Sequence, residues 1–131
     1  MDLAKRFRTD EEAEKTGIWQ PIGDGARLKL ARLNNPGYTK LYRHLIQDHR
    51  VLLEQGLLPD EIHDPIICEC LAATVLLDWE GIEFDGELMP YSRENALRTL
   101  TELKEFRNLV LRLAASWEAY RVALLELDRK N

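Results

Sequence analysis

The sequence predicts a mainly α-helical protein: a small bundle of about four helices with a β-hairpin near the N-terminus. Apolar residues recur at three- and four-residue steps over most of residues 36–127, which is typical of amphipathic helices. Between residues 18 and 33 they alternate with polar residues on both sides of a glycine-rich turn, which is typical of a hairpin. No internal repeat, low-complexity tract or Pro/Gly-rich linker divides the 131 residues. We therefore expect a single domain, residues 1–131.

The N-terminal part of the chain carries the predicted hairpin. Residues 1–16 show no clear periodicity, although Leu3, Ala4 and Phe7 would share one apolar face of a short helix, and we expect a frayed start there. After them, Ile18 and Ile22 lie on one face of the first predicted strand, and Gly23-Asp24-Gly25 has the composition of a tight turn. Pro21 has no N–H to donate to a neighbouring strand, so this strand is expected at an edge of the sheet.

Two helix starts follow the hairpin. Asn35-Pro36 combines an N-cap residue with a proline at the first helical position, and the amphipathic pattern behind it continues until Gly56. Asp64-Pro65 predicts a second start. The run Ile66–Leu77 behind it is apolar on nearly all sides, which is typical of a helix in the middle of a bundle.

The C-terminal part is predicted as a connection and two helices. Residues 81–90 contain Asp85-Gly86, a pair that favours a tight turn, and enough apolar side chains for the segment to pack against the domain. Ser92 is placed to cap a short helix. Near Leu103 the chain is expected to turn into a long last helix, whose apolar stripe continues to Leu124.

Composition and charge restrict the class of protein. The chain has 18 Lys and Arg against 23 Asp and Glu, a formal charge of −5, and 45% of its residues are hydrophobic. These values are typical of a soluble globular protein. No apolar segment follows the basic residues near the start, and no stretch reaches the roughly 20 apolar residues of a membrane span. The two cysteines, one residue apart in an apolar run, favour a reducing compartment, so we expect a cytoplasmic protein without membrane partners.

Catalytic and metal-binding patterns are weak in this sequence. Cys68 and Cys70 are two residues apart on a predicted helix and point about 200° apart, whereas ligands of one ion need a step of three or four residues. The acidic cluster of residues 78–87 lacks the calcium-binding loop pattern and is expected to be a solvated loop. No serine lies in a Gly-x-Ser-x-Gly turn. The sequence therefore predicts no enzyme activity, no metal site and no cofactor.

A small basic strip on the predicted hairpin consists of Arg27, Lys29 and Arg32. Lys and Arg at a sheet edge commonly prevent aggregation, and the chain as a whole is acidic. We therefore expect no nucleic acid partner. The alternative function is that of a small helical DNA-associated or regulatory protein, which would use this strip together with Arg43 and Arg50.

Aromatic and methionine side chains gather around the connecting segment and the last helix. Such side chains anchor many protein interfaces, although core packing is their other common role. The candidate partner-binding residues are Trp79, Phe84, Leu88, Met89, Tyr91, Trp117 and Tyr120.

Two stretches of the chain resemble the tail assembly chaperones of lambda-like long-tailed bacteriophages. The first is Ala31–Tyr38, and the second runs from Leu76 to Ala96 and includes Trp79-Glu80-Gly81 and the loop Gly86-Glu87-Leu88-Met89-Pro90-Tyr91-Ser92. The resemblance lies in the order of the features: a hairpin, an Asn-Pro helix start, an apolar helix ending in Trp-x-Gly, the Pro-Tyr-Ser loop and a last amphipathic helix. It extends over residues 19–120.

The resemblance implies a non-catalytic protein of the host cytoplasm that is absent from the mature virion. Proteins of this family bind the long helical tape measure protein, keep it soluble and assist the recruitment of tail tube subunits. The implied partners are therefore the tape measure protein and the tail tube protein. A groove beside the last two helices would hold amphipathic helices of the partner, with many copies bound along one chain, and self-association of the copies is left open.

Overall fold

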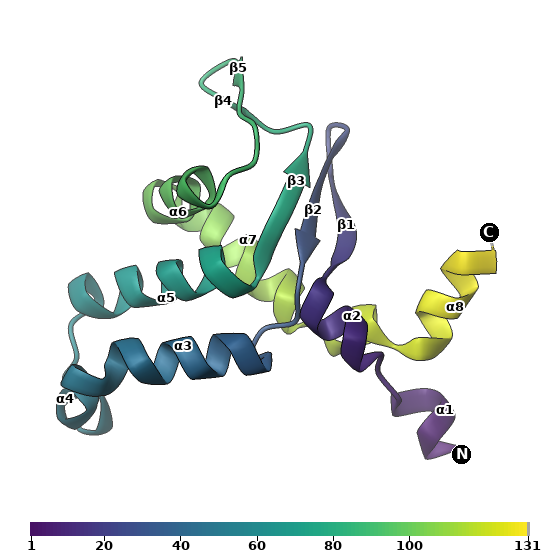
Figure 1. Ribbon diagram of the computed structural model, residues 1–131, viewed down its shortest axis with the longest axis horizontal. Coiled ribbons are helices and arrows are strands. Elements are labelled where there is room, and N and C mark those ends of the chain that lie inside the picture. Colours follow the sequence, from purple (N-terminus) through teal and green to yellow (C-terminus); the bar gives the residue numbers. More distant parts are fainter. Residues whose placement is uncertain (131) are drawn as a thin grey trace.

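The computed structural model describes residues 1–130 and shows an elongated molecule that mixes helices with two small sheets (Figure 1). Residue 131, the last residue of the predicted domain, lies outside the described residues. The elements follow in the order α1 (Leu3–Phe7), α2 (Glu11–Thr16), β1 (Ile18–Gly23), β2 (Ala26–Leu30), α3 (Pro36–Ile46), η1 (Gln47–His49), α4 (Arg50–Glu54), α5 (Asp60–Thr74), β3 (Leu76–Glu80), β4 (Glu83–Phe84), β5 (Glu87–Leu88), α6 (Arg93–Glu102), α7 (Lys104–Ala115), η2 (Trp117–Tyr120) and α8 (Val122–Lys130), where η marks a 3-10 helix.

The prediction of a bundle of about four helices with one hairpin is wrong. The hairpin of β1 and β2 is confirmed, but β3 pairs with β2 to make a three-stranded antiparallel sheet in the order β1-β2-β3, and β4 and β5 form a second, two-stranded sheet. Residues 76–80 were expected to continue the apolar helix. Their strand conformation depends on a partner about fifty residues earlier, since Leu28 pairs with Trp79, and local periodicity contains no signal for such a contact.

The edge position of β1, expected from Pro21, is confirmed. Leu28 and Leu30 on β2 are fully buried against the helices, whereas alternate residues of the sheet lie on the opposite face, towards solvent. There the Arg27 guanidinium lies 4.1 Å from the centre of the Trp19 ring and donates hydrogen bonds of 2.7 and 3.0 Å to the Glu80 carboxylate. One face of the sheet is therefore core and the other is polar.

The helix that follows the hairpin begins as predicted. The Asn35 side chain accepts a hydrogen bond from the Tyr38 N–H, Pro36 takes the first helical position, and the helical segment ends near Gly56, which has a φ of +69°. The predicted second start at Asp64-Pro65 is wrong. Helix α5 begins at Asp60 and continues through Pro65, its sixth residue, whose missing N–H removes one hydrogen bond of the helix, the one to the Glu61 carbonyl.

The predicted long last helix is interrupted. Helix α7 ends at Ala115, and the chain is extended at Ser116 and again at Arg121. The Tyr120 hydroxyl lies in the core and donates a 2.9 Å hydrogen bond to the Leu30 carbonyl.

Residues 1–16, which were expected to be frayed, contain α1 and α2, each with an aspartate N-cap. A short antiparallel bridge between Thr9 and Arg121 joins this N-terminal segment to the break between α7 and α8.

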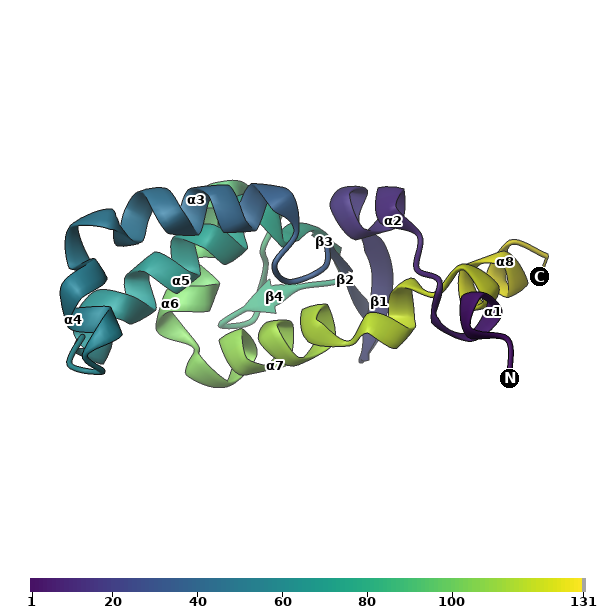
Figure 2. The same cartoon turned by 90° about the horizontal axis from the view of Figure 1, so that it is seen from below.

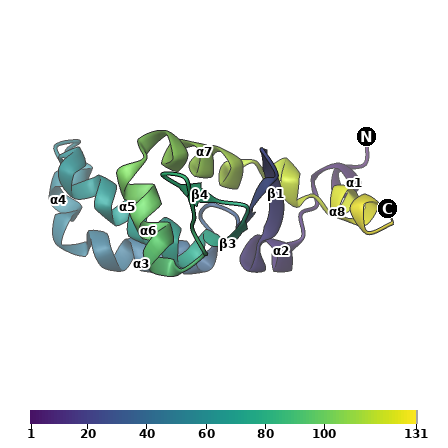
Figure 3. The ribbon, with the colours of Figure 1, turned by 90° about the horizontal axis from the view of Figure 1, so that it is seen from above.

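A layer of helices, α3, α5, α6 and α7, packs on the sheet through α5, which contacts β3, and through α7. Helix α5 packs between α3 and α6, and α7 packs on α6 and on β2. Figures 2 and 3 show that α4 lies at one end of the molecule and that α1 and α8, with both termini, lie at the other end. The largest fully buried side chains are Tyr120, Leu28, Leu30, Leu71, Leu76, Leu100, Val75, Val110, Cys68 and Cys70.

We predict that Asn35→Ala lowers the free energy of unfolding by about 2–4 kcal/mol, because it removes the N-cap and leaves two carbonyl oxygens without the Asn35 amide donor. Urea denaturation measures this change. The matched control is Asn108→Ala on the exposed face of α7, which is expected to shift the same quantity by less than about 0.5 kcal/mol. Equal midpoints for the two variants would contradict the structural role given to Asn35.

Candidate partner-binding surface

A short hairpin between β3 and α6 carries most of the predicted partner-binding residues. Its strands pair Glu83 with Leu88 and Phe84 with Glu87, which leaves Asp85 and Gly86 as a two-residue turn. Both turn residues have positive φ, +51° and +83°, which matches the hand of turn that the twist of a hairpin favours. The tight turn expected from the sequence is therefore confirmed.

Two aromatic residues fix this hairpin to the body of the protein. The indole N–H of Trp79 donates a 2.8 Å hydrogen bond to the Met89 carbonyl, and the Tyr91 hydroxyl donates a 2.7 Å hydrogen bond to the Leu76 carbonyl. The two rings meet edge to face with their centres 5.3 Å apart. Burial raises the pKa of Tyr91, so its hydroxyl keeps its proton at neutral pH and remains a donor. Both strand β3 and the segment leading to α6 thus hold the hairpin in place.

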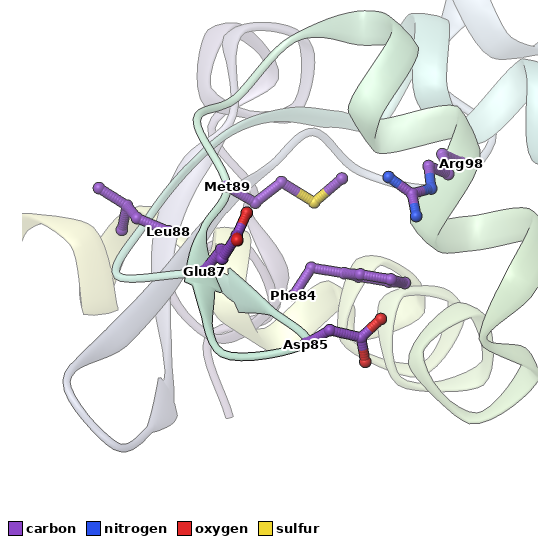
Figure 4. A pocket seen from close by; sticks show the side chains of 6 residues that line it. All are labelled: Phe84, Asp85, Glu87, Leu88, Met89 and Arg98. Carbon is purple, nitrogen blue, oxygen red and sulfur yellow. The ribbon is translucent and has the colours of Figure 1, made fainter.

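An open pocket of about 320 Å³ lies between the hairpin and α6 (Figure 4). We call it the hairpin pocket; its lining residues are Phe84, Asp85, Glu87, Leu88, Met89 and Arg98. The side chains of Phe84 and Met89 extend towards Arg98, whereas Leu88 points away from them. The Arg98 guanidinium lies 4.6 Å from the centre of the Phe84 ring and 3.3 Å from a Glu102 carboxylate oxygen. The lining of the pocket is therefore mixed, with the apolar Phe84, Leu88 and Met89 beside the charged Asp85, Glu87 and Arg98.

The seven predicted residues fall into two groups. Trp79, Phe84, Leu88, Met89 and Tyr91 come together at the hairpin, and Trp117 and Tyr120 lie far from it, in η2. Only Leu88 is largely exposed, at 74% of its surface. Trp79, Met89 and Tyr120 are at most 7% exposed, so these three side chains belong to the core. Burial follows from their roles: Trp79 and Tyr120 each satisfy a backbone carbonyl inside the protein.

Sequence reasoning missed two features of the surface. One is Arg98, which lines the hairpin pocket and gave no motif signal. The other is a set of exposed apolar side chains on the terminal helices, where Phe7 of α1 stacks on Trp117 with ring centres 5.4 Å apart. The spacing of Leu3 and Phe7 suggested one apolar helical face, but their neighbours on α8 are more than 110 residues away in the chain.

The predicted basic strip is largely neutralised. Arg27 pairs with Glu80, and this hydrogen bond is the main cause that lowers the pKa of the Glu80 carboxyl. Arg32 lies 3.1 Å from a Glu14 carboxylate oxygen. Two of its three cations therefore have carboxylate partners supplied by other elements of the fold.

Within the described part of the chain, no three His, Cys, Asp or Glu side chains group in a way that fits a metal ion. None of its helices combines the length and the apolar character needed to cross a membrane.

The fold defines a small α+β protein whose exposed large apolar side chains include Leu88 on the short hairpin, Val51, Leu52 and Leu57 at the α4 end, and a set on the terminal helices. A family profile described as YdaY prophage protein matches residues 33–131, so the chain belongs to that family. The match establishes a phage-derived protein, in agreement with the phage part of the resemblance, and its description names no tail assembly role. No curated protein and no solved structure matched the sequence.

We predict that Gly81→Ala lowers stability more than Gly86→Ala does. Both glycines have positive φ, but a Cβ on Gly81 would lie 2.7 Å from the Gly25 carbonyl oxygen in the β1–β2 turn, whereas nothing lies within 4 Å of one on Gly86. The backbone conformation alone costs about 1–2 kcal/mol, and the clash adds about 1–3 kcal/mol at Gly81. Thermal or urea unfolding of the two variants compares them directly. Equal losses would contradict the close approach of Gly81 to the β1–β2 turn.

Proposed function

We propose that this prophage protein is a non-catalytic tail assembly chaperone. It binds the tape measure protein in the host cytoplasm, keeps that protein soluble, assists the recruitment of tail tube subunits and does not remain in the mature virion. The observation that carries the proposal is Leu88, which is 74% exposed on a hairpin that Trp79 and Tyr91 hold fixed. The resemblance of Leu76–Ala96 to tail assembly chaperones covers this same segment, and membership of a prophage family is consistent with it.

The hairpin surface has the composition of a small protein interface. Leu88 supplies the exposed apolar contact, Phe84 and the small exposed part of Met89 supply apolar contact inside the pocket, and Asp85, Glu87 and Arg98 add charge to its lining. Interfaces commonly combine an apolar centre with a polar rim in this way. Because Trp79 and Tyr91 fix the backbone in advance, a partner helix that docks here pays little to order the hairpin.

A small contact of this kind suits a chaperone that acts in many copies. One buried leucine contributes about 1.5–3 kcal/mol, which by itself gives only weak binding. Copies that bind side by side along one long helical chain gain avidity without tighter single contacts, and such contacts release easily during tube assembly. The net charge of −5 keeps loaded complexes apart in solution.

A DNA-associated role receives less support from the surface. DNA binding draws its affinity from unpaired cations facing phosphates. Here Arg27 and Arg32 are bonded to Glu80 and Glu14, and the hairpin surface is flanked by Asp85 and Glu87.

Co-expression with the tape measure protein of the same prophage tests the proposal. The chain is expected to move that protein from the insoluble to the soluble fraction. Leu88→Asp is expected to reduce the soluble yield and to weaken binding about tenfold, because a charged group replaces the apolar anchor. The control Leu57→Asp alters a leucine of similar exposure, 65%, beside α4 and should leave both unchanged. Failure of the unaltered chain to raise solubility, or equal loss in both variants, would refute the proposal.

A further inference from the structure

Helices α5 and α6 leave a groove on the surface where they pack against each other. The two helices lie side by side (Figures 2 and 3), and two hollows of about 320 and 290 Å³ follow the line along which they meet. Pro65 and Thr101 line both hollows, so the hollows adjoin. We call them together the α5–α6 groove, which α5 lines from Asp60 to Glu69 and α6 lines at Leu97 and Thr101.

Apolar side chains of both helices line this groove. Pro65 is exposed, and Ile66 and Leu97 are half-buried, with part of each side chain packed on the core. Nine residue steps separate Asp60 from Glu69, which is about 14 Å along a helix. The groove therefore has the length of about two to three turns of a helix laid along it.

Carboxylates line the same groove. Four of its lining residues, Asp60, Glu61, Asp64 and Glu69, are acidic, and one, Arg107, is basic. The Arg107 guanidinium lies 3.4 Å from an Asp64 carboxylate oxygen, and the Arg107 side chain is only 11% exposed. Among residues 1–130, no Lys, Arg or His side chain forms an ion pair with the other three carboxylates. The groove therefore presents negative charge beside its apolar side chains.

The position of Glu69 has no local explanation. Asp60 and Glu61 lie in the first turn of α5, where carboxylates stabilise a helix by themselves. Glu69 is the tenth of the fifteen residues of α5 and lies outside the turn in which that effect acts. It is exposed, and it lines the groove together with the apolar Ile66 and Leu97.

We propose that the α5–α6 groove binds an amphipathic helix of a partner protein that carries Lys or Arg beside its apolar stripe. The stripe lies against Pro65 and Leu97, and the cations meet Glu61 and Glu69. These two glutamates are eight residues apart and share one face of α5 with Pro65, so they suit cations two turns apart on the partner helix. The groove shares no residue with the hairpin pocket, and the inference does not depend on the proposed function.

Charge and length decide against other occupants of the groove. Nucleic acids and anionic lipid surfaces are repelled by Glu61 and Glu69. In a symmetric pair of copies the groove meets itself, so the same carboxylates approach each other. Helix α1 of a second copy is basic, but its five residues span about half the groove, and its Lys5 and the adjacent Arg8 line a hollow against α8. A longer cationic helix avoids all of these conflicts.

Two synthetic helical peptides test the inference. Each is about 18 residues, or five turns, long and has the same leucine stripe; one carries Lys and the other Glu beside the stripe. We expect the 131-residue chain to bind the Lys peptide at least about tenfold more tightly than the Glu peptide, by fluorescence anisotropy of labelled peptide at low salt. Added salt is expected to reduce this preference.

A matched pair of lysine variants locates the binding. Thr101→Lys puts a cation on the exposed α6 residue that lines both hollows, and it is expected to weaken binding of the Lys peptide about tenfold. Thr16→Lys makes the same change of charge at the exposed end of α2 and should bind like the unaltered chain. Because Thr101 is exposed, both variants are expected to keep the urea midpoint of the unaltered chain.

A matched pair of glutamine variants removes charge without adding bulk. Glu61→Gln with Glu69→Gln is expected to weaken binding of the Lys peptide about fivefold. Glu12→Gln with Glu118→Gln removes two charges from exposed positions outside the groove and should change the affinity less than about twofold. If Thr101→Lys does not fold, this pair alone decides the location.

Leu88→Asp separates this inference from the proposed function. It alters the hairpin surface and leaves the α5–α6 groove unchanged, so we expect it to bind the Lys peptide like the unaltered chain. Loss of the Lys peptide in this variant would assign the basic helix to the hairpin and overturn the inference. Failure of the unaltered chain to keep the tape measure protein soluble would refute the proposed function and leave the groove standing.

Three further results would overturn the inference. They are equal affinity for the two peptides, equal affinity for the Lys peptide in the groove variants and their controls, and self-association in sedimentation that Thr101→Lys abolishes while the unaltered chain binds no peptide.

Discussion

The side-chain amide of Asn35 is the interaction on which the arrangement of the other elements depends. Its nitrogen donates to the carbonyls of Arg32 and Thr74, at 2.8 and 3.0 Å, and its oxygen accepts from the N–H of Tyr38. One residue thereby joins the end of the β1–β2 hairpin, the start of α3 and the end of α5. Since β3 begins two residues after Thr74, the same contact places β3 beside β2. Trp79 and Tyr91 then attach the β4–β5 hairpin to β3, so the position of Leu88 follows from this buried junction.

Features encoded by a few adjacent residues were predictable from the sequence, and features that depend on distant partners were not. The Asn35 and Ser92 caps and the turn at Asp85-Gly86 each act within a few residues, and all three are present. The strand Leu76–Glu80 is apolar enough to continue a helix, and only its pairing with β2 makes it a strand. The break after Ala115 has a similar origin, because the Tyr120 hydroxyl reaches Leu30, ninety residues earlier. A stripe of apolar residues cannot show where a helix must stop to satisfy such a contact.

The same distinction applies to the candidate surface. The apolar and aromatic residues of the sequence indicated the hairpin as a candidate surface. Residue type alone does not distinguish a side chain that faces inward, such as Trp79, from an exposed one, such as Leu88. The exposed apolar side chains of α1 and α8 lie on helices from opposite ends of the chain, which the Thr9–Arg121 bridge brings together. The sequence predicted a basic strip of Arg27, Lys29 and Arg32. Two of these cations pair with Glu80 and Glu14, which come from other elements of the fold, so the sequence pattern of the hairpin alone could not show that they are neutralised. What results is a prophage-family protein with a polar outer sheet face and with exposed apolar side chains on a fixed hairpin, at the α4 end and on the terminal helices.

The central claim is that the hairpin surface contacts the tape measure protein, and hydrogen exchange tests it most directly. The 131-residue chain is compared alone and in complex with that protein, with peptides that separate residues 83–89 from residues 50–57. The account predicts slower exchange of the backbone amides of residues 83–89 in the complex, and unchanged exchange in residues 50–57, which carry exposed apolar residues of similar size at the α4 end. A complex in which residues 83–89 exchange as fast as in the free chain would contradict it.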